Sequence, residues 1–224
     1  MDGLTLSKNI RESLVEALGM YQSAMPGSRA DRYLQERQIG RRTQADLCLG
    51  FVGDNPAPGH EAYRGRLAIP YFGATGTLGT IRFRSVPDAE GNQAQPKMLG
   101  IPGHESRPYN VKVLMEDLTE IAICEGETDT MTVEASGAIR AVGIPGAQAW
   151  NNDMAKLFTG YKTVYVLADN DDSGAGMEFA KKVAKSVRNS YIVSMPDGED
   201  VNSLVCKKGF DALIERMGLD QHGS

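Results

Sequence analysis

The chain has 224 residues, of which 41% are hydrophobic and 24% are charged, and its three cysteines show no spacing typical of a zinc ribbon or a disulfide framework. This composition fits a soluble globular protein of one or two domains and argues against large-scale disorder. We expect a cytoplasmic protein without membrane contact, because no apolar stretch is long enough to cross a bilayer and the start of the chain does not resemble a signal peptide.

The net charge of −5 hides a difference between the two halves of the chain. Residues 1–112 carry 14 Lys and Arg against 11 Asp and Glu, whereas residues 113–224 carry 10 against 18. The acidic second half suits cations, and the slightly basic first half is weak support for phosphate binding. His60 and His104 each lie beside a glycine in loop-like sequence, so we expect loop or surface histidines there rather than a metal or nucleophile site.

The first quarter of the chain is predicted to be helical. Apolar residues at helical spacing predict an amphipathic helix over 6–21, which ends at the Met-Pro-Gly sequence of 25–27. A second short helix is predicted over 28–37, with a further turn or two near 44–49. Residues 51–63 are rich in Pro and Gly and indicate a loop.

Two strands of a hairpin are predicted next, at 66–72 and 78–84, followed by a long loop over 87–110. In the second strand, Arg82 and Arg84 alternate with apolar residues. We therefore expect one face of this strand to lie on a core and the other to be exposed and cationic. A single Arg on such a face would be an ordinary solvated residue, but several together favour a surface that binds phosphates.

The second half of the chain alternates strands and helices. The strands are predicted at 121–124, 138–143, 163–168 and 191–194, and the helices at 128–136, 151–158 and 175–188. Repeated units of this kind imply a mostly parallel sheet, with ligands outside the carboxyl ends of its strands. Trp150 follows a Gly-Pro turn, and we interpret it as a core residue.

Acidic and amide side chains follow three of these strands at the points where the strands end. They are Glu125 and Asp129 after the first strand, Asp169 and Asp171 after the third, and Asp200 and Asn202 after the fourth. Packing several carboxylates together is costly unless a cation neutralises them. Oxygen ligands without histidine or thiolate favour Mg²⁺ or Mn²⁺ over zinc. Glu127 is equally well explained as an acid that complements the dipole of the helix it begins.

In order and spacing, these motifs resemble the Toprim fold shared by bacterial and phage primases and type IA topoisomerases. The matching motifs are Glu-Gly-x-x-Asp at 125–129, Asp-x-Asp at 169–171 and Asp200 beyond them. In the first half, Tyr33-Leu34-x-x-Arg37 and the segments 49–51, 65–71, 81–84 and 96–99 resemble the amino-terminal lobe of DnaG-type primases. The resemblance covers roughly residues 28–206.

This resemblance implies a Toprim-type α/β fold, with a mostly parallel sheet flanked by helices, and a smaller α+β lobe. The expected segments are an N-terminal helix over 1–27, a basic α+β lobe over 28–115, a Toprim catalytic domain over 116–206, and a C-terminal helix and tail over 207–224. A topoisomerase would also need a tyrosine nucleophile on a large gate domain, for which the chain is too short.

The resemblance also implies a function: template-directed synthesis of short RNA primers on single-stranded DNA from NTPs, by metal-assisted nucleotidyl transfer with Mg²⁺ or Mn²⁺. The implied catalytic residues are Glu125, Asp169 and Asp171. The implied metal ligands are Glu125, Asp169, Asp171 and Asp200, with Asp129 and Asn202 in support. The residues implied to bind template and nucleotide phosphates are Arg64, Arg66, Arg82, Arg84 and Lys97.

Two departures from the family pattern leave other functions open. Asn202 stands where the family often has a second aspartate, which removes one negative charge. We also recognise no amino-terminal zinc-binding domain and no helicase motor, so a replicative helicase or a separate zinc-domain chain is an expected partner. The alternatives are a Toprim nuclease, which would cleave DNA without NTPs, and a catalytically weak single-stranded-DNA-binding replication module that needs a partner chain.

Overall fold

The computed structural model describes residues 7–104, 107–146 and 149–219, so the expected first residue of the N-terminal helix, Leu6, and the last residues of the C-terminal tail lie outside the described part. The chain divides into two compact units. Unit 1 comprises residues 1–36 and 40–105, and unit 2 comprises residues 37–39 and 106–224. No described helix combines the length and the apolar character that crossing a bilayer requires.

Unit 1 contains a four-stranded antiparallel sheet in the order β1-β2-β3-β4. Its central hairpin, β2 (Arg66–Phe72) and β3 (Leu78–Ser85), matches the predicted strands. The outer strands β1 (Gly50–Phe51) and β4 (Met98–Gly100) fall in or beside segments that the sequence indicated as loops. Both are too short to carry a pattern of alternation, and they form because they pair with the hairpin.

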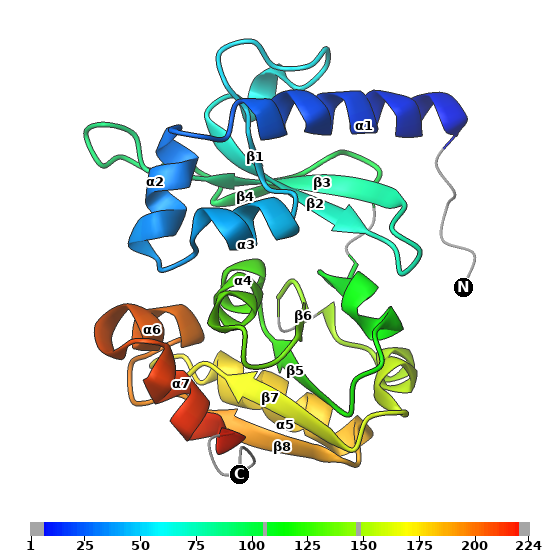
Figure 1. The fold of residues 1–224 in the computed structure, drawn as a ribbon, viewed down its shortest axis with the longest axis vertical. Coiled ribbons are helices and arrows are strands. Elements are labelled where there is room, and N and C mark those ends of the chain that lie inside the picture. The colour runs from blue at the N-terminus through cyan, green and yellow to red at the C-terminus, as the bar shows by residue number, and fades with distance from the viewer. Residues whose placement is uncertain (1–6, 105–106, 147–148, 220–224) are drawn as a thin grey trace. The chain divides into compact units, whose positions relative to one another are not determined.

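The helices of unit 1 pack around this sheet. Helix α1 (Lys8–Ser23) lies along the sheet (Figure 1) and buries Leu14, Ala17, Leu18 and Tyr21 in one hydrophobic cluster with strand residues that include Phe83. The long N-terminal helix is therefore part of this unit rather than a separate segment. Three short helices complete the unit: α2 (Arg29–Glu36), α3 (Arg41–Asp46) and the 3-10 helix η1 (Glu61–Tyr63).

Unit 2 contains the parallel sheet that the alternating pattern predicts. Its strands are β5 (Glu120–Cys124), β6 (Ala141–Gly143), β7 (Thr163–Ala168) and β8 (Ser190–Ser194), in the order β6-β5-β7-β8. All three pairings are parallel. Together with the flanking helices, this sheet confirms the predicted fold class.

Helices cover both faces of this sheet, as Figure 1 shows. Alternate strand residues pack on α5 (Ala175–Ser186) and the 3-10 helix η4 (Asn152–Phe158) on one face. The other residues of the strands pack on α4 (Glu127–Ser136), α6 (Val201–Lys208) and α7 (Phe210–Met217). A further 3-10 helix, η2 (Val111–Met115), precedes β5.

The structure refines three of the sequence predictions for unit 2. The segment expected as a helix over 151–158 is a 3-10 helix, and the strand expected from residue 138 begins at Ala141. The expected boundary at residue 206 falls inside α6, which continues to Lys208. Trp150 is 2% exposed, lies in the core beneath α5, and donates a hydrogen bond from Nε1 to Ser186, in agreement with its interpretation as a core residue.

Candidate metal and catalytic site

The carboxyl ends of β5 and β7 lie at the same edge of the parallel sheet. The two strands are paired neighbours, with Ile123 opposite Val166. Glu125 and Asp169 each follow the end of one of these strands, so the register brings the two carboxylates to one edge, as the sequence predicted. This edge is the candidate site.

Asp169 has a strongly raised pKa. Burial raises the pKa of its side chain to about 8, and neighbouring carboxylates add to this effect. In decreasing order of influence, these neighbours are Asp129, Glu125, Asp200 and Asp171. The Oδ1 atom of Asp169 is buried and has no hydrogen-bond partner. A buried carboxylate oxygen without a partner, in a cluster of acids, is unfavourable in the folded chain, and a bound cation would compensate it.

Two glycines let the elements around this edge approach each other closely. A Cβ atom on Gly176, in the first turn of α5, would lie 2.4 Å from the main-chain oxygen of Asp169 and 2.8 Å from its Cβ atom. A Cβ atom on Gly143, at the end of β6, would lie 2.4 Å from Oγ1 of Thr130. Sequence reasoning missed both residues, although a glycine soon after an acidic strand end is the signal that would have found Gly176.

Glu125 and Asp129 reach the site from the turn between β5 and α4. Glu125 is half-buried, and burial, followed by the charge of Asp171, raises its pKa. Asp129 lies in the first turn of α4, is 8% exposed, and accepts a hydrogen bond at Oδ1 from the main-chain N–H of Asn202, at 3.2 Å. Asp129 is therefore fixed by α6, whereas Glu125 is held at the strand end itself.

Asp171 and Asp200 are exposed, and each uses one oxygen to order its own turn. Oδ1 of Asp171 accepts hydrogen bonds from the main-chain N–H and the hydroxyl of Ser173, at 3.0 and 2.6 Å. Oδ1 of Asp200 accepts a hydrogen bond of 2.6 Å from the main-chain N–H of Ser203, in a capping box that begins α6. Asn202 is 6% exposed, and its side chain donates to neighbouring acceptors.

The chemistry of this donor set fits a divalent cation. All of the side chains offer oxygen, which suits Mg²⁺ or Mn²⁺, and a cation would compensate the buried, unpartnered oxygen of Asp169. Within residues 7–104, 107–146 and 149–219, no three His, Cys, Asp or Glu side chains already form a group that could hold a metal ion. The carboxylates thus lie at one edge of the sheet, but in the described residues their side chains do not converge into a formed metal-binding group.

The basic residues predicted to bind phosphates do not all share one face of the sheet in unit 1. Arg82 and Arg84 are half-exposed on the same face of β3, and their side chains donate to the hydroxyls of Tyr71 and Tyr33. Alternation along β2 and its register with β3 place Arg66 on the opposite face. The set continues with two exposed residues, Arg64 and Lys97.

The prediction that Arg66 faces phosphates together with Arg82 is therefore corrected. Arg66 is 6% exposed, burial lowers its pKa, and it donates a hydrogen bond of 2.9 Å to the main-chain oxygen of Pro96. Its guanidinium thus anchors the segment that leads into β4. The sequence does not show on which face of the sheet the Arg66 side chain lies. The residues of β2 are apolar along most of its length, so they do not alternate in a way that would distinguish the two faces.

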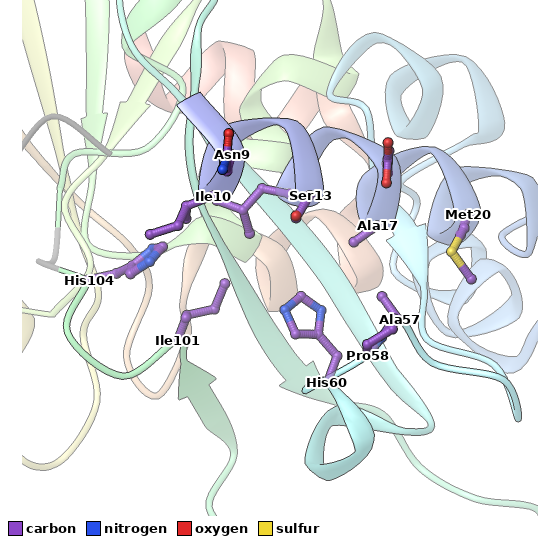
Figure 2. Close-up of a pocket in the computed structure, with 12 residues that line it drawn as sticks. Asn9, Ile10, Ser13, Ala17, Met20, Ala57, Pro58, His60, Ile101 and His104 are labelled. Atoms are coloured by element: carbon purple, nitrogen blue, oxygen red, sulfur yellow. The ribbon is translucent and has the colours of Figure 1, made fainter. Parts of the chain in front are cut away.

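A cavity of about 420 Å³ in unit 1 lies between α1 and the loops that contain His60 and His104 (Figure 2). Nδ1 of His60 lies 2.7 Å from the hydroxyl of Tyr21, and Nδ1 of His104 lies 2.8 Å from Oγ1 of Thr80. Burial lowers the pKa of His60, which leaves it neutral at pH 7. Among the described residues that line this cavity, Glu16 carries the only fixed formal charge, so the cavity does not suit nucleotide phosphates.

Comparison with known proteins extends over both units. A Toprim-like family profile matches residues 122–205. The Gene 57 protein of Mycobacterium phage D29 is 46% identical over 159 residues, which cover 69% of this chain and 99% of that protein. A DNA primase of Pseudomonas putida is 24% identical over 191 residues, which cover 79% of this chain and 28% of that primase. This chain thus spans less than a third of the length of that primase.

Solved structures of primase cores share the fold. A DnaG primase catalytic domain bound to single-stranded DNA matches with a TM-score of 0.76 at 20% identity, over 96% of this chain and 81% of that one. The RNA polymerase domain of Mycobacterium tuberculosis primase DnaG matches with a TM-score of 0.75 at 19% identity, over 95% of this chain and 84% of that one.

Proposed function

Because this chain belongs to the DnaG-type primase family and carries its Toprim domain, we propose that it is a primase catalytic core that synthesises short RNA primers on single-stranded DNA. One observation carries the proposal. At the edge of the parallel sheet, the buried Oδ1 atom of Asp169 has no partner, and four other carboxylates raise its pKa beyond the effect of burial. This arrangement supports a phosphoryl-transfer site that binds cations.

The proposed ligands of Mg²⁺ or Mn²⁺ are Glu125, Asp169, Asp171 and Asp200. When bound, the cation supplies positive charge that stabilises the attacking 3′ oxygen and the leaving pyrophosphate. In the reaction, the 3′ oxygen of one ribonucleotide forms a bond to the α-phosphorus of an incoming NTP, and the bond from that phosphorus to the bridging oxygen of the β-phosphate breaks. Pyrophosphate leaves with the electron pair of that bond.

Glu125 is the proposed acceptor of the proton that the 3′ hydroxyl loses. In the metal-free chain, burial and the charge of Asp171 raise the pKa of Glu125, so this carboxylate lies in an environment that favours taking up positive charge. Glu125 follows β5 directly, so the rigid sheet holds its main chain in place. Asp129 is the proposed support, because the N–H of Asn202 already fixes its carboxylate.

Template and nucleotide phosphates are the proposed ligands of the basic side chains in unit 1. Arg82 and Arg84 share one face of β3 and are half-exposed, and Arg64 and Lys97 are exposed. Phosphate contacts of this kind supply affinity and position without reading the base sequence. The expected binding is therefore salt-sensitive and largely independent of sequence.

A primer-synthesis assay tests the proposal. The purified chain is supplied with a single-stranded DNA template, NTPs and Mg²⁺ or Mn²⁺, and RNA products are resolved by length. We expect products that disappear on omission of the cation, in Glu125→Gln and in Asp169→Asn, and that persist in Asp172→Asn, which changes an exposed neighbouring acid. Full synthesis by Glu125→Gln, or synthesis without any divalent cation, would disprove the assigned site.

The same assay separates the two alternatives. Cation-dependent cleavage of DNA in the absence of NTPs would support a Toprim nuclease. Salt-sensitive binding of single-stranded DNA with no product, even after addition of a replicative helicase or a separate zinc-domain chain, would support a binding module. Products that form only with such a partner chain would support a primase core that depends on it.

A further inference from the structure

Asn202 lies at the start of α6, at the position where a second carboxylate of the third acidic motif would stand. We propose that Asn202 is a positioning residue that joins three segments of unit 2, and that it is not a metal ligand. The inference rests on the proposed function only in treating the acidic motifs as the cation site. Its basis is the set of hydrogen bonds that the amide makes, all of them within unit 2.

The hydrogen-bond partners fix the role of each amide atom. Nδ2 of Asn202 lies 2.8 Å from Oγ1 of Thr132 and 3.0 Å from the main-chain oxygen of Arg37. The Thr132 hydroxyl donates its own proton to the main-chain oxygen of Thr128, at 2.9 Å, so its oxygen must accept from Asn202. The carbonyl of Arg37 can only accept. Both protons of Nδ2 are therefore used, one on each partner.

The contact of the amide oxygen supports the same orientation of the side chain. Oδ1 of Asn202 lies 3.8 Å from the sulfur of Cys206, one turn later in α6, and accepts the weak thiol hydrogen bond. An amide turned by half a rotation would direct its oxygen at two acceptors, so one orientation alone satisfies the surroundings. The side chain thus holds α6 to α4 and to the segment 37–39, which belongs to unit 2.

The main chain of Asn202 acts on the acidic cluster directly. Its N–H donates to Oδ1 of Asp129, at 3.2 Å, and Asp129 is the neighbour with the largest influence on Asp169. The side chain of Asn202 therefore ties the first turn of α6 to Thr132 and Arg37, and its main-chain N–H holds the carboxylate of Asp129. Asn202 acts on the proposed cation site through Asp129, without offering an oxygen to it.

An aspartate at this position has the wrong chemistry for its surroundings. Its carboxylate would face the oxygens of Thr132 and Arg37 with no proton to donate, in a place that is 6% exposed for Asn202. Restoring the charge that the family often has would then remove two hydrogen bonds and bury a charge. We expect Asn202→Asp to loosen unit 2 without adding a metal ligand.

The test compares thermal unfolding in EDTA with the number of Mn²⁺ ions bound, counted from the electron paramagnetic resonance signal of free Mn²⁺. For Asn202→Asp in the full chain, we expect Tm to fall by at least about 5 °C and the number of bound Mn²⁺ ions not to rise. The matched control is Asn151→Asp. The Asn151 side chain accepts from two main-chain N–H groups, so a carboxylate fits there and Tm should hold.

A second variant keeps the test decisive if Asn202→Asp does not fold. Thr132→Val removes one of the two acceptors and leaves one amide proton unpaired, so it should lower Tm, and Asn202→Asp should cost less in that background than in the unaltered chain. An unchanged Tm for either single variant, or one additional Mn²⁺ ion bound by Asn202→Asp, would overturn the inference. Because neither readout needs primer synthesis, the two proposals can fail separately. A chain that behaves as expected here but makes no RNA, even after addition of a replicative helicase or a separate zinc-domain chain, would refute the proposed function and leave this inference standing.

Discussion

Asp169→Asn should make the metal-free protein more stable at neutral pH while it abolishes synthesis. Burial and the neighbouring acids raise the pKa of Asp169 from 3.8 to about 8, so the folded chain binds this proton more tightly than the unfolded chain does. The contribution of the group to stability is therefore complete below about pH 4 and is lost as the pH rises toward about 8. An asparagine does not ionise and escapes that loss.

The size of the effect follows from the same shift. One pKa unit corresponds to about 1.4 kcal/mol, so about three pH units between the unfolded pKa and pH 7 set an upper limit near 4 kcal/mol. Asp169 is half-buried, and solvent screening and relaxation of the neighbouring acids reduce the expected gain to about 2 kcal/mol. For a chain of this size, that gain raises Tm by about 4–8 °C.

The assay is thermal unfolding in EDTA from pH 5 to pH 8, followed by circular dichroism, for the unaltered chain, Asp169→Asn and the exposed control Asp172→Asn. Other titrating groups, such as His60, cancel when the profile of each variant is subtracted from that of the unaltered chain. We expect a difference that grows with pH for Asp169→Asn and stays flat for the control. Added Mg²⁺ should stabilise the unaltered chain and leave Asp169→Asn unchanged. A variant that is less stable than the unaltered chain at pH 7 in EDTA would refute the reasoning.

Two further predictions concern packing and charge. Gly176→Ala should lower the free energy of unfolding by about 1–3 kcal/mol and reduce Mn²⁺ binding, because its Cβ atom would overlap the main chain of Asp169, whereas Gly160→Ala, which has open space, should be neutral in thermal unfolding. Arg84→Ala should weaken binding of single-stranded DNA and reduce the slope of log affinity against log salt by about 1. Arg66→Ala should instead lower Tm and leave that slope unchanged; equal slopes for both Arg variants would contradict the assignment of faces.

The sequence predicts the central elements of both units well, for identifiable reasons. The strand at 163–168 is a nearly unbroken apolar run bounded by polar turns, and the structure places β7 over the same residues. The outer strands β1 and β4 are two and three residues long, and their extended conformation depends on partners elsewhere in the chain. The local sequence pattern of such short strands does not predict their pairing.

In the candidate site too, some features follow from local sequence, and others depend on residues that are distant in the sequence. The order of the acidic motifs on alternating strands and helices is enough to predict that Glu125 and Asp169 lie at the same edge of the sheet, because parallel neighbours end at one edge. The amide of Asn202 bonds to the carbonyl of Arg37, 165 positions away in the sequence. From the sequence alone, Asn202 is interpreted as a weakened metal ligand. The structure shows that its side chain is a hydrogen-bond donor, and no sequence spacing connects it to the residue whose carbonyl it binds.

The short segment Arg37–Ile39 affects how the chain can be cut into fragments. It belongs to unit 2, although residues on both sides of it belong to unit 1, and Ile39 is 0% exposed. A recombinant fragment that starts at Ser106 would retain every acidic motif. It would lack the Arg37 carbonyl that Asn202 binds and the buried side chain of Ile39. Such a truncation is expected to be poorly soluble on its own, and addition of a synthetic peptide that spans 37–39 with its neighbours should rescue it in trans.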